Sequence, residues 1–252
     1  MNILIVGASR GVGKHIALNY ATKGNNLILI ARDEESLKKV QNKCQQIGVA
    51  SIVYFPCDVT NTKNLSDILE KILSKHHIDL CIYAAGMTSL INNNEFEDLY
   101  HCDKLLKTNL NGAITVTNYL LPKMLERNIG HIIYFSSLAS YYGMGYSPSY
   151  CASKAGIRVY AESVRQYCYK TNINISVITM GFVESDMSQQ FIRPKPFLIS
   201  TEKAARYIYK KINARKAYIR FPFILQIAIR IQSILPYKIA DWFMIKSGYG
   251  RK

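Results

Sequence analysis

A serine, a tyrosine and a lysine stand at spacings that suit proton transfer. Ser137 precedes Tyr150 by thirteen positions, and Lys154 follows that tyrosine by four. On a helix, residues four apart point from one face, so the phenol and the ammonium would enter the same site. A free tyrosine titrates near ~10, and a nearby cation favours the phenolate, so we expect Lys154 to lower the pKa of Tyr150. The pair could then move protons at neutral pH.

The Ser137 hydroxyl follows an apolar run, residues 131–135, that predicts a buried strand opening onto a loop. At the edge of a sheet it could hydrogen-bond a substrate oxygen. The Tyr-x-x-x-Lys pattern is weak by itself, because surface helices often carry such a pair. A second motif is therefore needed to give it meaning.

That motif is a glycine turn near the N-terminus. The apolar run 1–6 leads into Gly7, Gly11 and Gly13, and the pattern of residues 16–20 is typical of a helix. Glycines let the backbone approach a pyrophosphate, which free N–H groups and the helix dipole then bind. The Gly-x-x-x-Gly-x-Gly spacing alone is also compatible with an ordinary turn.

Together the two motifs resemble the short-chain dehydrogenase/reductase family in its single-domain form, over roughly residues 2 to 187. The strength of the resemblance lies in the order and spacing of six motifs. It implies a catalytic tetrad of Asn109, Ser137, Tyr150 and Lys154. The cofactor-binding residues that it implies are Gly7, Ser9, Gly11, Gly13, Asp58, Val59, Ala84, Ala85, Gly86, Tyr150, Lys154, Gly181, Val183 and Ser185.

Two residues depart from the family pattern. Tyr83 stands where the family usually has asparagine, and Met180 stands where it usually has proline. We expect the first to change a hydrogen bond that ties strands together, and the second to loosen a turn beside the nicotinamide. Ser185 replaces the usual threonine and keeps its hydroxyl.

The rest of the chain alternates strand and helix patterns. Strands are predicted near 2–6, 25–31, 51–57, 78–84, 130–136, 173–180 and 216–220, and helices near 11–23, 33–47, 61–76, 103–127, 149–171 and 201–214. Apolar strands without alternation indicate a parallel sheet covered on both faces. The predicted fold class is α/β: a doubly wound, Rossmann-like parallel sheet in three layers, with a C-terminal helical extension. Dinucleotides bind at the carboxyl edge of such a sheet, directly after most of these motifs.

The choice of cofactor depends on one phosphate. Arg32 follows the second strand, and Arg10 lies in the glycine turn, so two planar donors could bind a 2′-phosphate. Asp33 offers the competing interpretation, an acid on the ribose of NAD. We interpret Asp33 as the N-cap of the following helix instead. NADP(H) is therefore predicted over NAD(H), and exposed solubilising charge is the alternative role of both arginines.

Composition favours one globular unit over residues 1–252. A chain of 252 residues with 49% hydrophobic content can bury a sizeable core, and no linker or repeat divides it. The six cysteines show no metal-ligand spacing, and we expect reduced thiols and no metal site. Met1 leads straight into a strand, without room for a signal peptide, so we expect a cytoplasmic protein, with a peripheral position on the inner face of a membrane as the alternative.

The C-terminal part is strongly basic. From Ser188 onward, fourteen Lys or Arg and only two acidic residues give a charge of +12, out of +15 for the whole chain. No nucleic-acid-binding motif accompanies this charge, so we expect no nucleic acid partner. Residues 188–220 are interpreted as a substrate loop, a helix and the last strand. Residues 221–252 are interpreted as a basic amphipathic segment.

Within that segment, residues 223–235 form an apolar run between Pro222 and Pro236. Gln226, Arg230 and Ser233 make one narrow polar stripe on it. The run is too short to span a bilayer, which leaves packing in a homo-oligomer, a wall of the substrate pocket, or peripheral membrane contact. Trp242 and nearby lysines fit an interfacial segment as well.

These features predict an oxidoreductase that transfers hydride between NADP(H) and a carbonyl or alcohol carbon. Tyr150 would exchange the proton, Ser137 would hydrogen-bond the same oxygen, and the resemblance implies that Asn109 positions a water leading from Lys154 to solvent. The small-molecule substrate would be apolar or carry an apolar or anionic group, because residues 182–197 hold, among basic residues, Phe182, Met187, Phe191, Pro194, Pro196 and Phe197. The alternatives are an NAD(H)-dependent dehydrogenase, a catalytically silent nucleotide-binding protein, and chemistry on nucleotide sugars.

Overall fold

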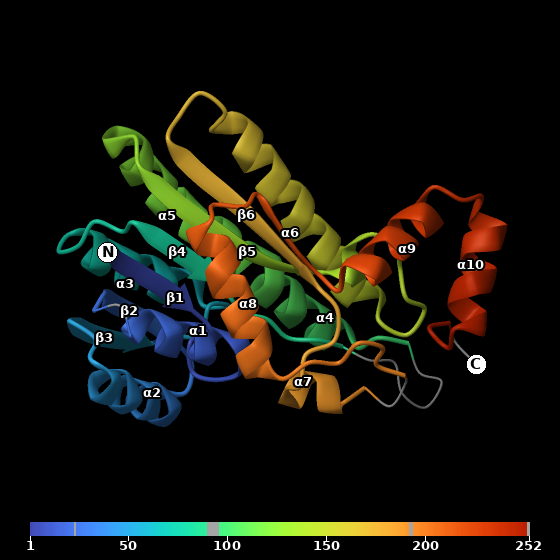
Figure 1. The fold of residues 1–252 in the computed structure, drawn as a ribbon, viewed down its shortest axis with the longest axis horizontal. Helices are drawn as coiled ribbons and strands as arrows, with labels where there is room; N and C mark the ends of the chain where they lie inside the picture. Colours follow the sequence, from blue (N-terminus) through green and yellow to red (C-terminus); the bar gives the residue numbers. More distant parts are fainter. Residues whose placement is uncertain (23, 90–95, 192–193, 251–252) are drawn as a thin grey trace.

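The computed structural model describes residues 1–22, 24–89, 96–191 and 194–250, and it is built around one parallel sheet (Figure 1). The seven strands lie in the order β3-β2-β1-β4-β5-β6-β7. All of their pairings are parallel. The strands are β1 (Asn2–Val6), β2 (Asn26–Ala31), β3 (Ser51–Pro56), β4 (Leu80–Tyr83), β5 (Gly130–Ser137), β6 (Ile173–Met180) and β7 (Tyr218–Phe221).

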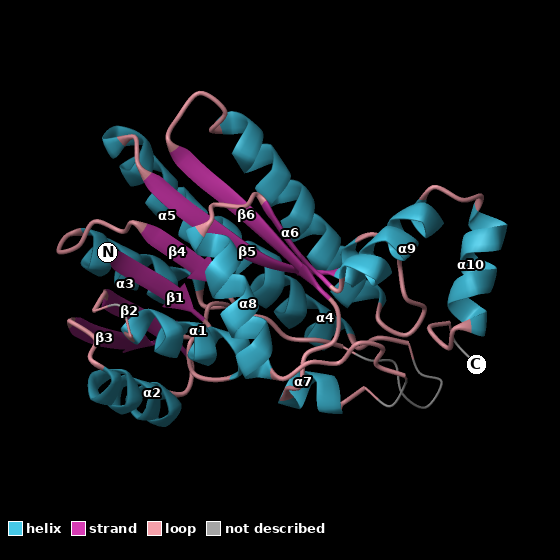
Figure 2. Cartoon of the chain, in the orientation of Figure 1, coloured by secondary structure: helices cyan, strands magenta, loops and turns pink. Residues whose placement is uncertain are grey.

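Helices cover both faces of this sheet (Figure 2). They are α1 (Gly11–Ala21), α2 (Glu34–Ile47), α3 (Thr62–Leu73), α4 (Leu99–Leu106), α5 (Gly112–Arg127), α6 (Pro148–Tyr167), α7 (Asp186–Gln189), α8 (Thr201–Asn213), α9 (Phe223–Ser233) and α10 (Tyr237–Lys246). Buried side chains of α1, α2 and α8 form one core with the sheet. Those of α3, α5 and α6 form the second core on its other face.

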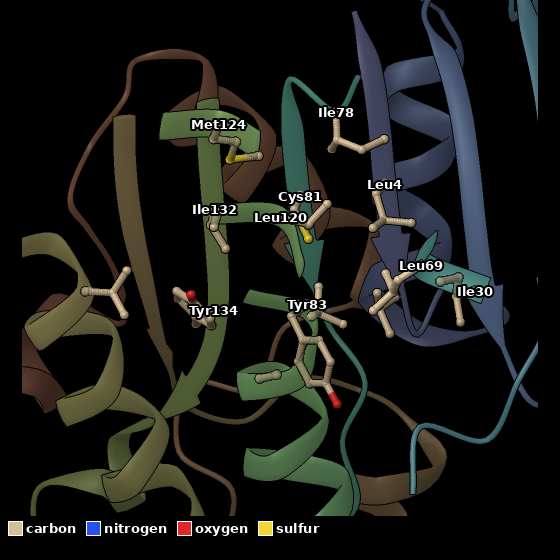
Figure 3. Packing of buried hydrophobic residues seen from close by; sticks show 14 of the residues in the cluster. Leu4, Ile30, Leu69, Ile78, Cys81, Tyr83, Leu120, Met124, Ile132 and Tyr134 are labelled. Atoms are coloured by element: carbon tan, nitrogen blue, oxygen red, sulfur yellow. The ribbon is translucent and has the colours of Figure 1, made fainter. Parts of the chain in front are cut away.

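The second core explains why the inner strands carry apolar residues without alternation. Leu4, Cys81 and Ile132, on neighbouring strands, all point into it (Figure 3). Their chain neighbours Ile3, Ile82 and Ile133 point into the opposite core. A strand buried on both faces needs apolar side chains at every position, so the prediction of a doubly covered parallel sheet is confirmed.

The predicted strands are all present, and their ends differ by no more than two residues from the prediction. The predicted helix 103–127 is present and begins earlier, at Leu99. It runs without a break through α4, a π-helical turn at Lys107–Asn111, and α5, and the π-helical turn was not predicted. Such bulges in a helix frequently mark functional sites.

A tertiary contact accompanies this turn. The Tyr83 phenol donates a hydrogen bond to the Thr108 carbonyl oxygen at 2.6 Å, drawing that carbonyl toward the sheet. A Cβ atom on Gly112 would collide with the Tyr83 hydroxyl, so glycine is required where the helix passes over it. We expected Tyr83 to change a hydrogen bond between strands. Its hydrogen bond instead joins β4 to the π-helical turn.

The chain after β7 forms the predicted helical extension. Helices α9 and α10 lie together at one end of the molecule, opposite α2, and they project beyond the sheet (Figure 1). The Gln232 side chain donates to the Ala240 carbonyl at 3.0 Å and joins the two helices.

Candidate functional site

A cavity of about 1400 Å³ runs along the carboxyl edge of the sheet and onto the C-terminal extension. The ends of β1, β4, β5 and β6 reach it, as do the first turns of α1 and α6. Doubly wound sheets bind ligands at this edge. The loops that follow the parallel strands all leave the sheet there, before the chain returns through the helices.

The glycine turn forms one wall of the cavity. Gly7 has a φ of +87°, a backbone conformation that favours glycine, and it follows directly on β1. Gly13 packs so closely on Gly7 that a Cβ atom there would collide with the Gly7 carbonyl oxygen. Arg10, at the N-cap position of α1, makes no capping hydrogen bond in the described structure. The first N–H groups of α1 are thus available to an anion in the cavity.

Ser137 and Tyr150 meet at the far side of the cavity. Ser137 ends β5 and Tyr150 lies in the first turn of α6, and both line the cavity. Burial raises the pKa of Tyr150 to about 12, although the Ser137 hydroxyl opposes that rise. The expected lowering of this pKa by Lys154 is therefore wrong for the protein by itself, because desolvation of the phenolate dominates. A neutral phenol is the form that can donate a proton.

Lys154 is buried one helical turn further along α6. Its Nζ donates a hydrogen bond to the Phe135 carbonyl oxygen at 3.0 Å and lies 5.8 Å from the centre of the Tyr150 ring. Burial lowers the pKa of Lys154 to about 8. The Lys154 carbonyl oxygen accepts a hydrogen bond from Ser136 Oγ at 2.8 Å, which fixes this turn of α6 against β5.

Asn109 lies within the π-helical turn and behind the cavity wall. Its Oδ1 accepts from the Met87 N–H at 2.8 Å, and its Nδ2 donates to the Met87 carbonyl and to Ser153 Oγ, both at 2.9 Å. Ser153 Oγ in turn donates to the Tyr150 carbonyl at 2.8 Å. Among the described residues, Asn109 does not line the cavity. Its side chain joins the loop after β4 to the helix that carries Tyr150.

Charged side chains gather at the glycine-turn end. Arg10 pairs with Asp186 at 2.9 Å, and Arg32 Nη1 lies 3.9 Å from Asp58 Oδ2. Both arginines line the cavity and are more than half exposed. Burial works to raise the pKa of Asp58, but hydrogen bonds from Thr60 and the charge of Arg32 outweigh it and lower that pKa.

Asp33 also lines the cavity, but its carboxylate has another role. Its Oδ1 accepts a hydrogen bond from the Ser36 N–H at 2.8 Å and caps α2. The N-cap interpretation is confirmed.

All of the residues predicted to bind a cofactor line this one cavity, Arg10 and Arg32 included. Of the predicted substrate-loop side chains, Phe182, Met187, Phe191 and Pro196 line it. Among the described residues, Pro194 and Phe197 do not. The phenyl rings of Phe182 and Phe191 stand 5.1 Å apart, so this wall is aromatic.

Sequence reasoning missed several lining residues. Leu138, Met144 and Ser147 come from the connection between β5 and α6, and Ser36 comes from the first turn of α2. The sequence did indicate a further group of lining residues, because a wall of the substrate pocket was one of the three interpretations of the apolar run 223–235. Leu225 and Ile229 of α9 line the cavity, together with Phe243 and Met244 of α10.

Comparison with known proteins shows similarity to dehydrogenases and reductases. The family model described as short chain dehydrogenase matches residues 1–195. An uncharacterized oxidoreductase of Myxococcus xanthus is 30% identical over 239 residues, which cover 94% of each chain. The ketoacyl reductase HetN of a Nostoc species is 33% identical over 218 residues, 84% of this chain and 75% of that protein.

A solved structure shares the fold at low sequence identity. It is a short-chain dehydrogenase from Sphingobium yanoikuyae in complex with NADPH, with a TM-score of 0.81, 16% identity, and coverage of 98% of this chain and 94% of that one.

Proposed function

The chain belongs to the short-chain dehydrogenase/reductase family, and from this premise we propose that it is an NADP(H)-dependent carbonyl reductase or alcohol dehydrogenase. The observation that carries the proposal is the meeting of Ser137, Tyr150 and Lys154 in the same cavity as the glycine turn. This arrangement supports proton transfer and dinucleotide binding at one place.

The donor groups of the cavity fit a dinucleotide phosphate. The glycine turn brings the backbone and the first N–H groups of α1 to the cavity, where a pyrophosphate would be bound. Arg10 and Arg32 would bind the 2′-phosphate of NADP(H), and Ser36 adds a hydroxyl nearby. When bound, this cofactor supplies or accepts a hydride. Asp33 supports the second candidate, NAD(H), because it also lines the cavity.

The side chains of α6 and β5 would handle the proton. In carbonyl reduction, Tyr150 donates a proton to the oxygen that gains negative charge, and Ser137 donates a hydrogen bond to it. The Lys154 cation favours the phenolate that Tyr150 leaves behind and holds the nicotinamide ribose. In alcohol oxidation, the same groups act in the opposite direction.

Asn109 would act by position rather than by touching the reacting atoms. Through Ser153, its amide fixes the turn of α6 that carries Tyr150. The chain of hydrogen bonds supports a role in holding the phenol at the angle that proton transfer requires. The water that the family resemblance places beside this asparagine remains part of the proposal.

The substrate would be apolar over much of its length. Leu138, Met144, Phe182 and Phe191 line the cavity, and Leu225 and Ile229 continue the apolar lining along α9. Burying such side chains together with a hydrocarbon chain contributes about 0.8 kcal/mol for each methylene group. An aliphatic or ring ketone fits this lining better than a sugar does.

The test is an activity screen combined with one substitution. The purified protein is mixed with NADPH, and the loss of its absorbance is followed with ketones, long-chain 3-oxo lipids and keto sugars. Tyr150→Phe should slow turnover by roughly 10²–10⁴-fold and leave NADPH binding intact, because only the proton donor is lost. Tyr160→Phe, on the same helix, is the control. Wild-type turnover by the Tyr150 variant would reject the assignment.

A further inference from the structure

One residue of the polar stripe of α9 is turned toward the protein body, although a polar residue on an apolar helix normally faces water. Gln226 is 1% exposed. Its Oε1 accepts from Thr179 Oγ1, and its Nε2 donates to the Tyr141 hydroxyl, both at 3.0 Å. The Arg230 guanidinium donates to the same hydroxyl at 3.3 Å and lies 5.0 Å from the centre of the Tyr141 ring. Gln226 is thus held inward, whereas Arg230 and Ser233 of the same stripe are exposed.

Large apolar side chains of α9 and α10 point outward. On α9, exposed side chains recur at Phe223, Ile227 and Ile231, one stripe with a spacing of four residues, and Ile234 continues it past the end of the helix. Helix α10 adds exposed aromatic and aliphatic groups. We define the outer face by six of these residues: Phe223, Ile224, Ile234, Tyr237, Trp242 and Ile245.

Each side chain of the outer face is more than half exposed, and Ile234 is 82% exposed. An apolar surface this rich in large side chains is unusual on a protein surrounded only by water, and it marks an interaction site. Helices α9 and α10 form an arm at one end of the molecule (Figure 1).

We propose that the outer face docks on an anionic lipid surface. The aromatic groups Tyr237 and Trp242 are of the kinds that lie at headgroup level, and exposed Lys238 and Lys246 flank them on the same helix. Each lysine near anionic lipid adds attraction. Asp241, the one acidic residue of α10, accepts a hydrogen bond from the Tyr142 hydroxyl at 2.7 Å and is thus held toward the protein.

Docking would be along the surface and not through it. In the part of the chain that the structure describes, no helix has both the length and the apolar run needed to cross a membrane. Helices α9 and α10 have eleven and ten residues. An apolar stripe on a short helix beside lysines is the pattern of a helix that lies in the interface.

A second copy of the chain fits the outer face less well. In a symmetric pair the same patch meets itself, so Lys238 and Lys246 would be brought toward their own copies. Each chain also carries a formal net charge of +15, which opposes self-association at low salt. Anionic lipid supplies the opposite charge together with an apolar layer.

The cavity reaches the outer face. Ile231 and Phe243 line the cavity and are also 53% and 47% exposed, so its lining continues onto the exposed apolar surface between α9 and α10. An apolar substrate could pass from the lipid into the cavity without crossing water. This last step rests on the proposed function, whereas docking itself does not.

The experiment measures vesicle binding of the full chain without cofactor or substrate, so its result does not depend on the enzyme assay. Flotation with phosphatidylcholine vesicles is compared with flotation with vesicles that also contain phosphatidylserine, at low and high salt. We expect binding to the anionic vesicles only, weakened by salt. A chain that stays unbound would overturn the proposal.

Two pairs of substitutions locate the contact. Ile224→Gln with Ile234→Gln removes apolar groups, and Lys238→Glu with Lys246→Glu reverses charge. Each pair should weaken binding roughly tenfold or more. The matched controls are Ile47→Gln with Val53→Gln and Lys38→Glu with Lys39→Glu, at the opposite end of the molecule, and they should bind normally.

Two results would contradict the assignment of this surface. One is unchanged binding by both outer-face pairs. The other is a dimer, seen by light scattering, that Ile224→Gln with Ile234→Gln converts to monomer. The second result would assign the face to a second copy of the chain.

Discussion

Arg10 and Asp186 form an ion pair at 2.9 Å that joins the glycine turn to the start of α7. Both residues line the cavity, 176 positions apart in the sequence. The guanidinium that we propose as a ligand of the 2′-phosphate is therefore already held by a carboxylate. A phosphate must compete with Asp186 for it.

Removing that competitor should favour NADPH. Exposed ion pairs contribute about 0–1 kcal/mol, so Asp186→Asn should tighten NADPH binding by up to about fivefold. NADH, without the phosphate, should change less. Fluorescence titration gives both dissociation constants. Glu126→Gln, which breaks the exposed pair with Lys123 on α5, is the control, and weaker NADPH binding by the Asp186 variant would contradict the competition.

The two arginines should set the choice between cofactors. We expect the wild-type chain to bind NADPH at least tenfold more tightly than NADH, since charge-assisted hydrogen bonds contribute roughly 1.5–3 kcal/mol each. Arg10→Ala with Arg32→Ala should remove most of this preference without weakening NADH binding much. Equal dissociation constants of the wild type for the two cofactors would exclude Arg10 and Arg32 as phosphate ligands and favour Asp33.

Carbonyl reduction should lose rate as the pH rises through about 8. Burial lowers the pKa of Lys154 to about 8, so this cation is present below that pH and lost above it. The pKa of Tyr150, about 12, keeps the phenol protonated throughout that range. The measurement is kcat/KM against pH, which reports groups of the free enzyme.

Lys154→Arg provides the comparison for that profile. An arginine does not lose its proton in this range, so the alkaline limb near pH 8 should disappear, even if the maximal rate falls. A limb that stays near pH 8 in this variant would show that another group titrates there.

Tyr83 and Gly112 should be coupled energetically. Tyr83→Phe leaves the Thr108 carbonyl without its phenol donor and should cost about 1–3 kcal/mol of unfolding free energy. Gly112→Ala places a methyl group against the Tyr83 hydroxyl and should destabilise the wild-type background. In the Tyr83→Phe background that collision is relieved, so Gly112→Ala should cost less there.

Urea unfolding of the four proteins measures this cycle. We expect a coupling energy of about 0.5–3 kcal/mol between the two positions. Strictly additive costs would mean that Gly112 is needed for another reason, such as its contact with Val59.

The sequence by itself determined the features that depend on near neighbours. The glycine turn, the strands and the capping of α2 by Asp33 follow from residues within a few positions of one another. The same holds for Tyr150 and Lys154, which one helix carries at a spacing of four. Local backbone geometry fixes such features, so their patterns can be read along the chain.

Only the tertiary structure decided the features that depend on burial and on distant partners. The pKa of Tyr150 rises because the folded chain surrounds it, which outweighs the nearby lysine that the spacing indicates. The predicted long helix contains a π-helical turn where Tyr83, at the end of β4, donates a hydrogen bond to the Thr108 carbonyl.

The orientation of α9 is the clearest case. Its sequence shows a polar stripe but not which residue of the stripe is buried. Gln226 is held inward by Thr179 and Tyr141, which bind it from distant parts of the chain. A buried polar side chain loses its hydrogen bonds to water, and partners within the protein must replace them. Polar residues can therefore turn inward wherever such partners exist. Their positions come from packing of the whole chain, which spacing along the sequence does not contain.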